Sequence, residues 1–218
     1  MPRAAIFDMD GLMVDSEPLW TMAEIDVFGA IGVPLTRERC FETRGLRIDE
    51  VVAYWYERYR WTIASADVVQ ARVLESVAAL IRLRAEPMPG ALEAIAHARK
   101  RCEKLAVASS SPRRLIEAVL EKFNIGSQFD MIHSAEDEEH GKPHPAVYLT
   151  TARALGVPPA ACVAFEDSFH GVLAAKAARM KCVAVPDRAQ QNDPRWAIAD
   201  VVVASLEKFD DVCWARLD

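Results

Sequence analysis

The sequence has no long apolar stretch and no closely spaced cysteine pair. No run reaches the roughly 18 apolar residues that a membrane-spanning helix needs. The N-terminal apolar run is short and is interrupted by Asp8, which argues against a signal peptide. The five cysteines are scattered, form no C-x-x-C pair and lie mostly among apolar neighbours, so we interpret them as reduced core residues. These absences favour a cytoplasmic protein with no membrane partner.

Positive charge is also in short supply. The 26 Lys and Arg residues are outnumbered by 32 Asp and Glu residues, which gives a formal net charge of -6. Nucleic acid is therefore not an expected partner, because its phosphate backbone requires a clustered basic surface and none is apparent. The chain also has no G-x-G-x-x-G or Walker A pattern, which excludes the commonest nucleotide sites. A small anionic ligand needs only a local positive site and stays open.

What the sequence does have is an alternation of short apolar runs and helical segments. Its 218 residues suffice for one core with a smaller appended domain. Apolar runs bounded by polar residues are typical of strands buried on both faces. They lie at 4–7, 104–109, 162–166, 182–186 and 200–205. Helix-like segments lie at 90–101, 111–123, 144–155 and 170–180. The alternation predicts an α/β fold in which helices cover a parallel sheet.

Residues 16–86 interrupt this alternation. The segment has no strand-like apolar run, is rich in helix formers and carries eight of the chain's 17 aromatic residues. It ends at "EPMPG" (86–90), whose prolines and glycine suit a hinge. We predict an inserted helical domain and interpret its aromatic cluster, including "YWYERYRW" (54–61), as the core of that domain.

Acidic residues recur where predicted strands end. Asp8 and Asp10 follow the first apolar run, and Glu166 and Asp167 follow "CVAF". Ligands bind outside the carboxyl ends of the strands in an open parallel sheet. Carboxylates gathered there repel one another unless a cation joins them, and oxygen ligands of this kind suit Mg²⁺. Helix caps or solvated loop residues are the alternative for a single pair, but two pairs at matching positions favour a site.

Two further segments could hold an anion. "AVASSSP" places Ser109, Ser110 and Ser111 between a predicted strand and a helix, where hydroxyl and backbone N–H groups can bind phosphate oxygens. "GKPHP" places Lys142 just before another predicted helix, where its charge can balance carboxylates and a phosphoryl group. Taken alone, such serines are usually helix caps and such a lysine is usually solvated.

Together, "DMDG", "VASSS", "GKPHP" and "EDS" followed by "HG" occur in an order that resembles the haloacid dehalogenase-like hydrolase superfamily, in particular its phosphatase branch. The resemblance covers essentially the whole chain. It implies a Rossmann-like catalytic core, residues 1–15 and 87–218, with an α-helical cap, residues 16–86, inserted after the first motif. The cap agrees with the helical segment found from the residue pattern.

The resemblance also implies a role for each motif. Asp8 is the expected nucleophile, forming an aspartyl-phosphate, and Asp10 the expected general acid and base. The expected Mg²⁺ ligands are Asp8, the backbone carbonyl of Asp10 and Asp167, with Glu166 acting through a water. The transferred phosphoryl group is expected to be held by Ser109 and Lys142, with Ser110 beside them.

Motifs in the cap narrow the expected substrate. "DSEPLW" (15–20) and "GLRID" (45–49) are similar to those of family members that hydrolyse hexitol and 2-deoxyglucose phosphates, which implies a small hexose or polyol phosphate as substrate. Glu17 and Arg47 are candidate substrate contacts, although Arg47 is equally consistent with a solvated arginine at a helix start. Two alternatives stay open: a β-phosphoglucomutase, which shares the core motifs and the cap type, and a catalytically silent protein that binds phosphorylated ligands. The family also favours a monomer.

Overall fold

The structure, a computed structural model, describes residues 2–43 and 46–217. The first residue of the "GLRID" motif therefore lies outside the described residues, while Arg47 lies within them. Among the described residues, no helix combines the length and the apolarity needed to cross a bilayer.

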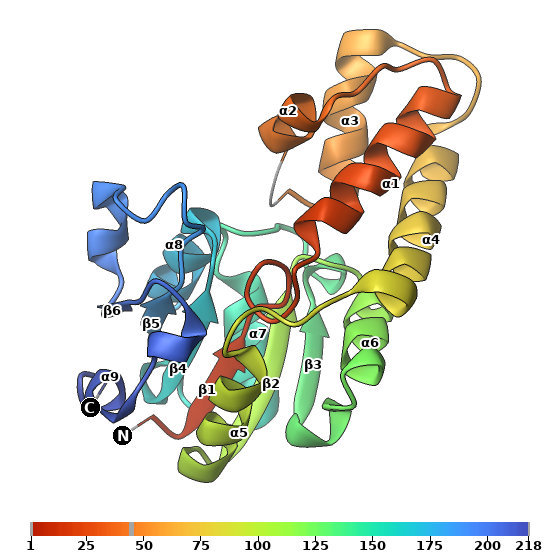
Figure 1. The fold of residues 1–218 in the computed structure, drawn as a ribbon. Helices are drawn as coiled ribbons and strands as arrows, with labels where there is room; N and C mark the ends of the chain where they lie inside the picture. Colours follow the sequence, from red (N-terminus) through yellow and green to blue (C-terminus); the bar gives the residue numbers. More distant parts are fainter. Residues whose placement is uncertain (1, 44–45, 218) are drawn as a thin grey trace.

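Within these residues, six parallel strands form one sheet in the order β3-β2-β1-β4-β5-β6 (Figure 1). The strands are β1 (Ala4–Phe7), β2 (Lys104–Ser109), β3 (Met131–Ser134), β4 (Cys162–Glu166), β5 (Lys181–Ala184) and β6 (Val201–Val202). The predicted α/β fold with a parallel sheet is confirmed. Two details differ: the sequence pattern missed β3, and β6 occupies only two residues of the predicted run 200–205.

Helices cover both faces of the sheet, because the strands alternate their side chains between two apolar layers. Ala5 and Phe7 of β1 belong to the layer that also contains the buried residues of α5 (Ala91–Arg101), α6 (Arg113–Lys122) and α9 (Asp211–Ala215). Ala4 and Ile6 face the opposite layer, with α7 (Ala146–Leu155) and α8 (Phe169–Ala177). A sheet buried on both faces explains why its strands read as continuous apolar runs. Short 3-10 helices lie at Phe41–Thr43, Gly126–Gln128, Ala135–Asp137, Pro159–Ala161, Pro194–Ile198 and Leu206–Lys208.

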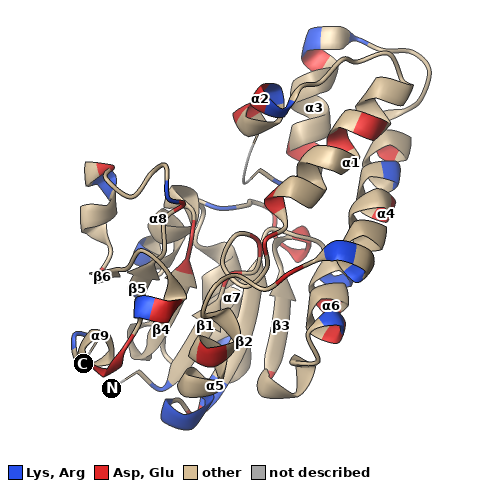
Figure 2. Cartoon of the chain, in the orientation of Figure 1, with Lys and Arg blue, Asp and Glu red and all other residues tan. Residues whose placement is uncertain are grey.

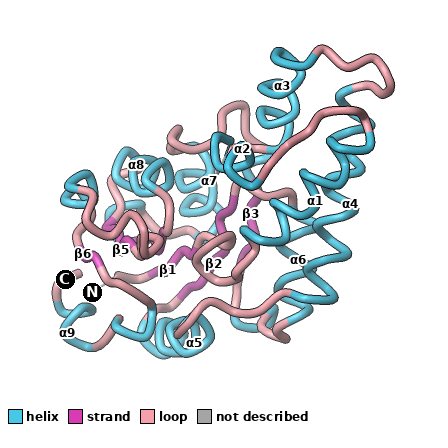
Figure 3. The backbone as a smooth tube through the Cα atoms, turned by 45° about the horizontal axis from the view of Figure 1, so that its top comes forward, coloured by secondary structure: helices cyan, strands magenta, loops and turns pink. Residues whose placement is uncertain are grey.

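The segment after β1 forms a separate group of helices above the carboxyl edge of the sheet (Figures 1 and 3). These helices are α1 (Glu17–Ala30), α2 (Arg37–Cys40), α3 (Ile48–Tyr59) and α4 (Ala66–Arg84). Aromatic side chains fill their interior: Phe28 is fully buried and stacks edge to face with Trp61, and Trp55 is 1% exposed. The cluster therefore forms the core of the cap, as its composition predicts.

Two chain segments connect the cap to the sheet, and they pair with each other. Val14 and Pro87 form an antiparallel bridge. The N–H of Asp15 donates to the carbonyl of Glu86 at 3.0 Å, and the N–H of Met88 donates to the carbonyl of Met13 at 3.1 Å. Both crossings of the cap boundary thus lie side by side, as a hinge requires. Asp15 itself is exposed and does not cap α1, whose N-cap is Ser16.

Candidate active site

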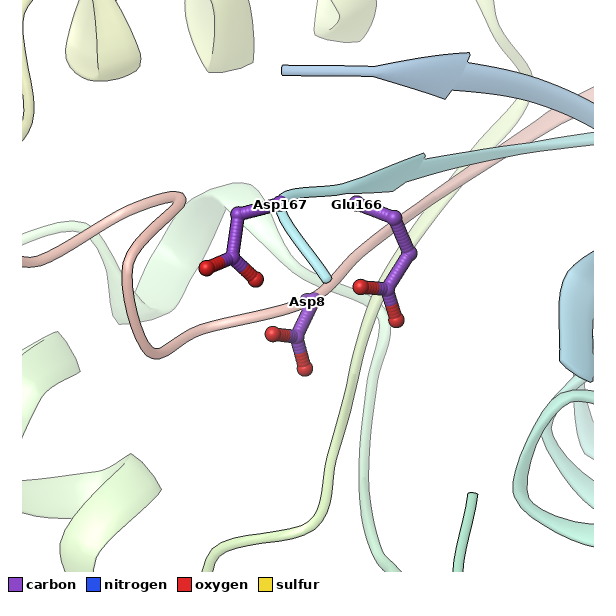
Figure 4. Close-up of side chains that lie close together, drawn as sticks. All are labelled: Asp8, Glu166 and Asp167. Carbon is purple, nitrogen blue, oxygen red and sulfur yellow. The ribbon is translucent and has the colours of Figure 1, made fainter. Parts of the chain in front are cut away.

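Parallel pairing brings the first and fourth motifs together. Phe7 of β1 is in register with Phe165 of β4, and the N–H of Asp8 donates to the Phe165 carbonyl at 3.0 Å. Asp8 therefore leaves the sheet beside Glu166, at the point where the strand order reverses. Figure 4 shows the Asp8, Glu166 and Asp167 carboxylates turned toward one region. One oxygen from each lies within 4.8 Å of the others, a spacing that could hold a metal ion.

Lys142 supplies the counter-charge. Its Nζ donates to Asp8 Oδ1 at 2.7 Å, to Glu166 Oε1 at 2.6 Å and to the carbonyl of Ala108 at 3.2 Å. Tyr148 of α7 donates its hydroxyl to the same Glu166 oxygen at 2.5 Å. Burial by itself lowers the pKa of Lys142, but the charges of Asp8 and Glu166 outweigh it and raise that pKa above its ordinary value. The lysine is thus a fixed cation between two buried carboxylates.

Negative charge still exceeds positive charge at the sheet edge. Burial raises the pKa of Asp8 to about 7, and the Glu166 charge adds to the rise, against the opposing effect of Lys142. The Asp167 carboxylate lies within 4.8 Å of those of Asp8 and Glu166, so three carboxyl groups share the single ammonium group of Lys142. A divalent cation would relieve this imbalance.

Asp10 lies apart from the cluster of Asp8, Glu166 and Asp167 and is bound by groups from both domains. On the cap side, Ser16 Oγ and the indole N–H of Trp20 donate to Asp10 Oδ1, at 2.6 and 3.1 Å. On the core side, Ser111 Oγ donates to Oδ2 at 2.6 Å. The sequence interpretation assigned no role to Ser16 or Trp20, and it offered Ser111 as a phosphate-binding candidate rather than as a partner of Asp10. Their signal was their presence inside the "DSEPLW" and "VASSS" motifs.

The serines after β2 line the same region. Ser109, the last residue of β2, is 1% exposed, and its Oγ accepts the N–H of Ser111 at 3.0 Å and lies 3.5 Å from Asp10 Oδ2. Ser110 is half-buried at the cleft surface. The structure therefore brings Asp8, Asp10, Ser109, Ser110 and Lys142 to one end of one cleft.

Two glycines make room for the carboxylates. Gly11 has a positive φ of 73°, and a Cβ there would lie 2.3 Å from Asp167 Oδ2. A Cβ on Gly171 of α8 would lie 1.9 Å from the Glu166 carboxyl group. A side chain at either position would displace a carboxylate, which explains the glycines of "DMDG" and "HG".

A cleft of about 420 Å³ lies between these strand ends and the cap. Glu17 of α1 lines it. Arg47 is not among the described residues that line the cleft. Its guanidinium instead donates to the core carbonyls of Ala135 and Glu138, at 3.4 and 3.1 Å. It also pairs with Asp49 at 2.7 Å. The substrate role of Arg47 stays a prediction, and the contacts present connect cap to core.

The family profile of haloacid dehalogenase-like hydrolases matches residues 2–179. The chain belongs to this family. It is 46% identical over 207 residues to hexitol phosphatase B of Escherichia coli K12, covering 94% of this chain and 93% of the relative. It is 33% identical over 176 residues to a phosphorylated carbohydrates phosphatase of Thermotoga maritima, covering 81% of each.

A solved structure supports the same assignment. CbbY from Rhodobacter sphaeroides, in complex with phosphate, is 28% identical and superimposes with a TM-score of 0.90 over 100% of both chains. The predicted family and the Rossmann-like fold are confirmed. The chain is a phosphatase, that is, a phosphoric monoester hydrolase. The individual roles assigned to its site residues stay predictions.

Proposed function

We propose that the protein hydrolyses small sugar or polyol phosphates with Mg²⁺ and an aspartyl-phosphate intermediate. The observation that supports this most strongly is that Asp8, Lys142 and Asp10 meet at one end of the cleft. Lys142 donates to Asp8, while Asp10 lies close by and is held by its own hydrogen bonds from Ser16 and Ser111. A nucleophile, an electrostatic stabiliser and an acid-base group are the parts that phosphate ester hydrolysis needs.

The donor set fits Mg²⁺. Asp8, Glu166 and Asp167 offer hard oxygen ligands within 4.8 Å of one another. In this proposal Asp8 and Asp167 hold the ion with the Asp10 carbonyl. Glu166, which already accepts hydrogen bonds from Lys142 and Tyr148, contributes through a water. When bound, Mg²⁺ neutralises charge on the phosphoryl oxygens and lets the anionic substrate approach the anionic nucleophile.

The chemistry then takes two steps. In the first, Asp8 attacks phosphorus, the bond between phosphorus and the leaving oxygen breaks, and Asp10 donates its proton to the leaving alkoxide. Lys142 and Ser109 stabilise the phosphoryl oxygens. In the second, a water gives its proton to Asp10 and attacks phosphorus, the bond from Asp8 to phosphorus breaks, and inorganic phosphate leaves with Asp8 regenerated.

Two observations support a sugar or polyol as the leaving group. Relatives that align with most of this chain are named hexitol phosphatase B and phosphorylated carbohydrates phosphatase. The cleft continues from Asp8 to polar groups of the cap, including Glu17 and Thr21. Hexose 6-phosphates, hexitol phosphates and 2-deoxyglucose 6-phosphate are therefore the first candidates.

Phosphate release from sugar, polyol and nucleotide monophosphates, measured with Mg²⁺ and with a chelator, tests the proposal. We expect chelator-sensitive release that favours hexose or hexitol phosphates. Asp8→Asn should lower kcat by about four orders of magnitude, because the covalent step is lost. Near-normal release from that variant would contradict the nucleophile assignment.

The same assay separates the alternatives. A phosphoglucomutase would convert glucose 1-phosphate to its 6-phosphate without stoichiometric phosphate release. A binding-only protein would do neither. The monomeric state and the cytoplasmic location stay predictions, to be checked by light scattering and by fractionation.

A further inference from the structure

Cap helix α1 places a buried carboxylate on the wall of the cleft. Glu24 is 6% exposed and is among the residues that line the cleft. It lies one or two helical turns after Glu17, Trp20 and Thr21, which also line it. Residues at this spacing share one face of a helix, so α1 presents a stripe of polar groups to the space above Asp8.

Glu24 is incompletely satisfied within the described protein. Its Oε2 is buried and has no hydrogen-bond partner. The thiol of Cys40 on α2, a weak donor, is a hydrogen-bond partner of the carboxyl group. Burial is the main cause that raises the pKa of Glu24 to about 7, and the nearby Glu17 adds to the rise. Burying a carboxyl group without full hydrogen bonding is costly, and a ligand in the cleft can supply the missing donors.

The charges of the residues that line the cleft indicate which kind of ligand group would donate a hydrogen bond to Glu24. Lys142 is already bound by Asp8 and Glu166 at the phosphoryl end. Arg195, the other Lys or Arg side chain among the described residues of the lining, pairs with Asp193 at 2.6 Å. The side of the cleft that α1 forms carries two acidic residues, Glu17 and Glu24. A second phosphate or a carboxylate on the leaving group would be repelled there, whereas an uncharged hydroxyl group can donate to a carboxylate.

We propose that Glu24 binds hydroxyl groups of the leaving alcohol, and that it thereby selects uncharged polyhydroxylated leaving groups over anionic ones. The terminal torsion of glutamate is broad and roughly two-fold, so either oxygen can turn to the cleft. This inference rests on the proposed function, because it assigns a contact to the sugar portion of that substrate.

The test compares substrates with and without hydroxyl groups. Wild type, Glu24→Gln and Glu24→Leu are assayed on sorbitol 6-phosphate, glucose 6-phosphate and p-nitrophenyl phosphate. Asp26→Asn is the matched control, because Asp26 is an exposed acid on the same helix. For the sugar and polyol phosphates we expect kcat/KM to fall about 10- to 100-fold in Glu24→Leu, mainly through KM, and less in Glu24→Gln, which keeps one acceptor oxygen. Hydrolysis of p-nitrophenyl phosphate should stay within about twofold in both variants, since that substrate makes no such contact.

A bisphosphate tests the charge selection. For the wild type, kcat/KM should be lower for fructose 1,6-bisphosphate than for fructose 6-phosphate, and Glu24→Gln should reduce the difference between these two values.

A purely structural role for Glu24 predicts equal changes in kcat/KM on all substrates, and a Glu24 without any role predicts no change. Either result overturns the inference. If the variants lose selectivity as expected, the inference holds. A wild type that cleaves p-nitrophenyl phosphate but no sugar phosphate overturns the proposed function and this inference together, whereas a sugar-selective wild type with indifferent variants overturns the inference alone.

Discussion

At the scale of single residues, Asp10 is the carboxylate that joins the two domains. It receives hydrogen bonds from Ser16 and Trp20 of the cap side and from Ser111 of the core. Asp8, by contrast, is bound by Lys142. The two carboxylates of one short motif thus occupy different environments, which is what a nucleophile and an acid-base group require.

The first prediction concerns the proton that Asp10 supplies in the proposed mechanism. Asp10→Asn cannot protonate a leaving group. Hydrolysis of a sugar phosphate, whose alkoxide is a poor leaving group, should therefore slow more than hydrolysis of p-nitrophenyl phosphate, whose phenolate leaves without a proton. We expect kcat to fall about 10³-fold for glucose 6-phosphate and about tenfold or less for p-nitrophenyl phosphate. Steady-state kinetics with both substrates measures this. Equal losses on the two would show that Asp10 acts only by orienting its neighbours.

The second prediction concerns stability and the titration of Glu24. Its pKa is raised from 4.5 to about 7 on folding, so its protonated form favours the folded state. That contribution is present below pH 4.5 and is lost as the pH rises to 7. Glu24→Gln has no titrating group there, so its stability relative to wild type should rise across this window, by up to roughly 3 kcal/mol, and level off above it. Urea unfolding at several pH values without metal measures the difference, and a constant difference would contradict the raised pKa.

How far the site could be predicted depends on the range of the interactions. Asp8, Lys142 and Glu166 could be identified from the sequence, because each lies at a strand end or just before a helix, and the local residue pattern predicts where those elements lie. Ser16, Trp20 and Glu24 could not, because their contribution depends on how α1 is rotated against the core. That rotation is set by long-range packing, which no local pattern records.

At the scale of elements, α8 begins against a carboxylate of the site. Gly171 lies in its first turn, directly against Glu166. Alanine normally stabilises a helix relative to glycine by about 0.5–1 kcal/mol. Here the added methyl group would push Glu166 away from Lys142 and Tyr148, so the local preference of the helix is overridden by the site.

The third prediction follows from this contact. Gly171→Ala should lower kcat/KM about 100-fold or more and raise the Mg²⁺ concentration needed for half-maximal activity, since a displaced Glu166 would no longer order the proposed metal site. Gly29→Ala is the matched control, because a Cβ at Gly29 of α1 would meet nothing within 4 Å. Kinetics over a Mg²⁺ series measures both variants. Full activity in Gly171→Ala would mean that Glu166 has room to move without consequence.

Most elements could be predicted from periodicity, and the exceptions have a physical reason. β3 was missed because it is an edge strand that reads "MIHS", in which half the residues are polar. Its Ser134 is nevertheless fully buried, because its hydroxyl donates to the carbonyl of Ser111 at 2.7 Å. A polar residue satisfied by a distant partner breaks the apolar pattern on which the prediction depends.

At the scale of the whole molecule, the cap is attached to the core at the hinge, along the contact between α4 and α6, where Lys122 donates to the carbonyl of Arg82, and at a third point across the cleft. The hinge consists of the paired segments that contain Asp15 and Glu86. The third point is Arg47, whose guanidinium reaches the carbonyls of Ala135 and Glu138. In Figure 2, red segments of the ribbon mark acidic residues where the cap meets the core. Because Gly141 lies under the Arg47 side chain and directly precedes Lys142, this contact also touches the loop of the site.

The last prediction is that Arg47 holds the cap closed. Arg47→Gln removes the charged donor, and we expect KM for the best sugar phosphate to rise about three- to tenfold with kcat changed less, because the hydrogen bonds from this guanidinium to two part-buried carbonyls contribute only modestly. Hydrogen exchange at residues 13–15 and 86–88 should become faster in the variant, since a cap without this contact to the core opens at the hinge more often.

Arg72→Gln is the control, because Arg72 is an exposed arginine on α4. This variant should leave both KM and hydrogen exchange unchanged. A rise in KM without faster exchange would instead support the substrate contact that the sequence suggested for Arg47, because a residue that binds substrate need not alter the hinge of the free enzyme.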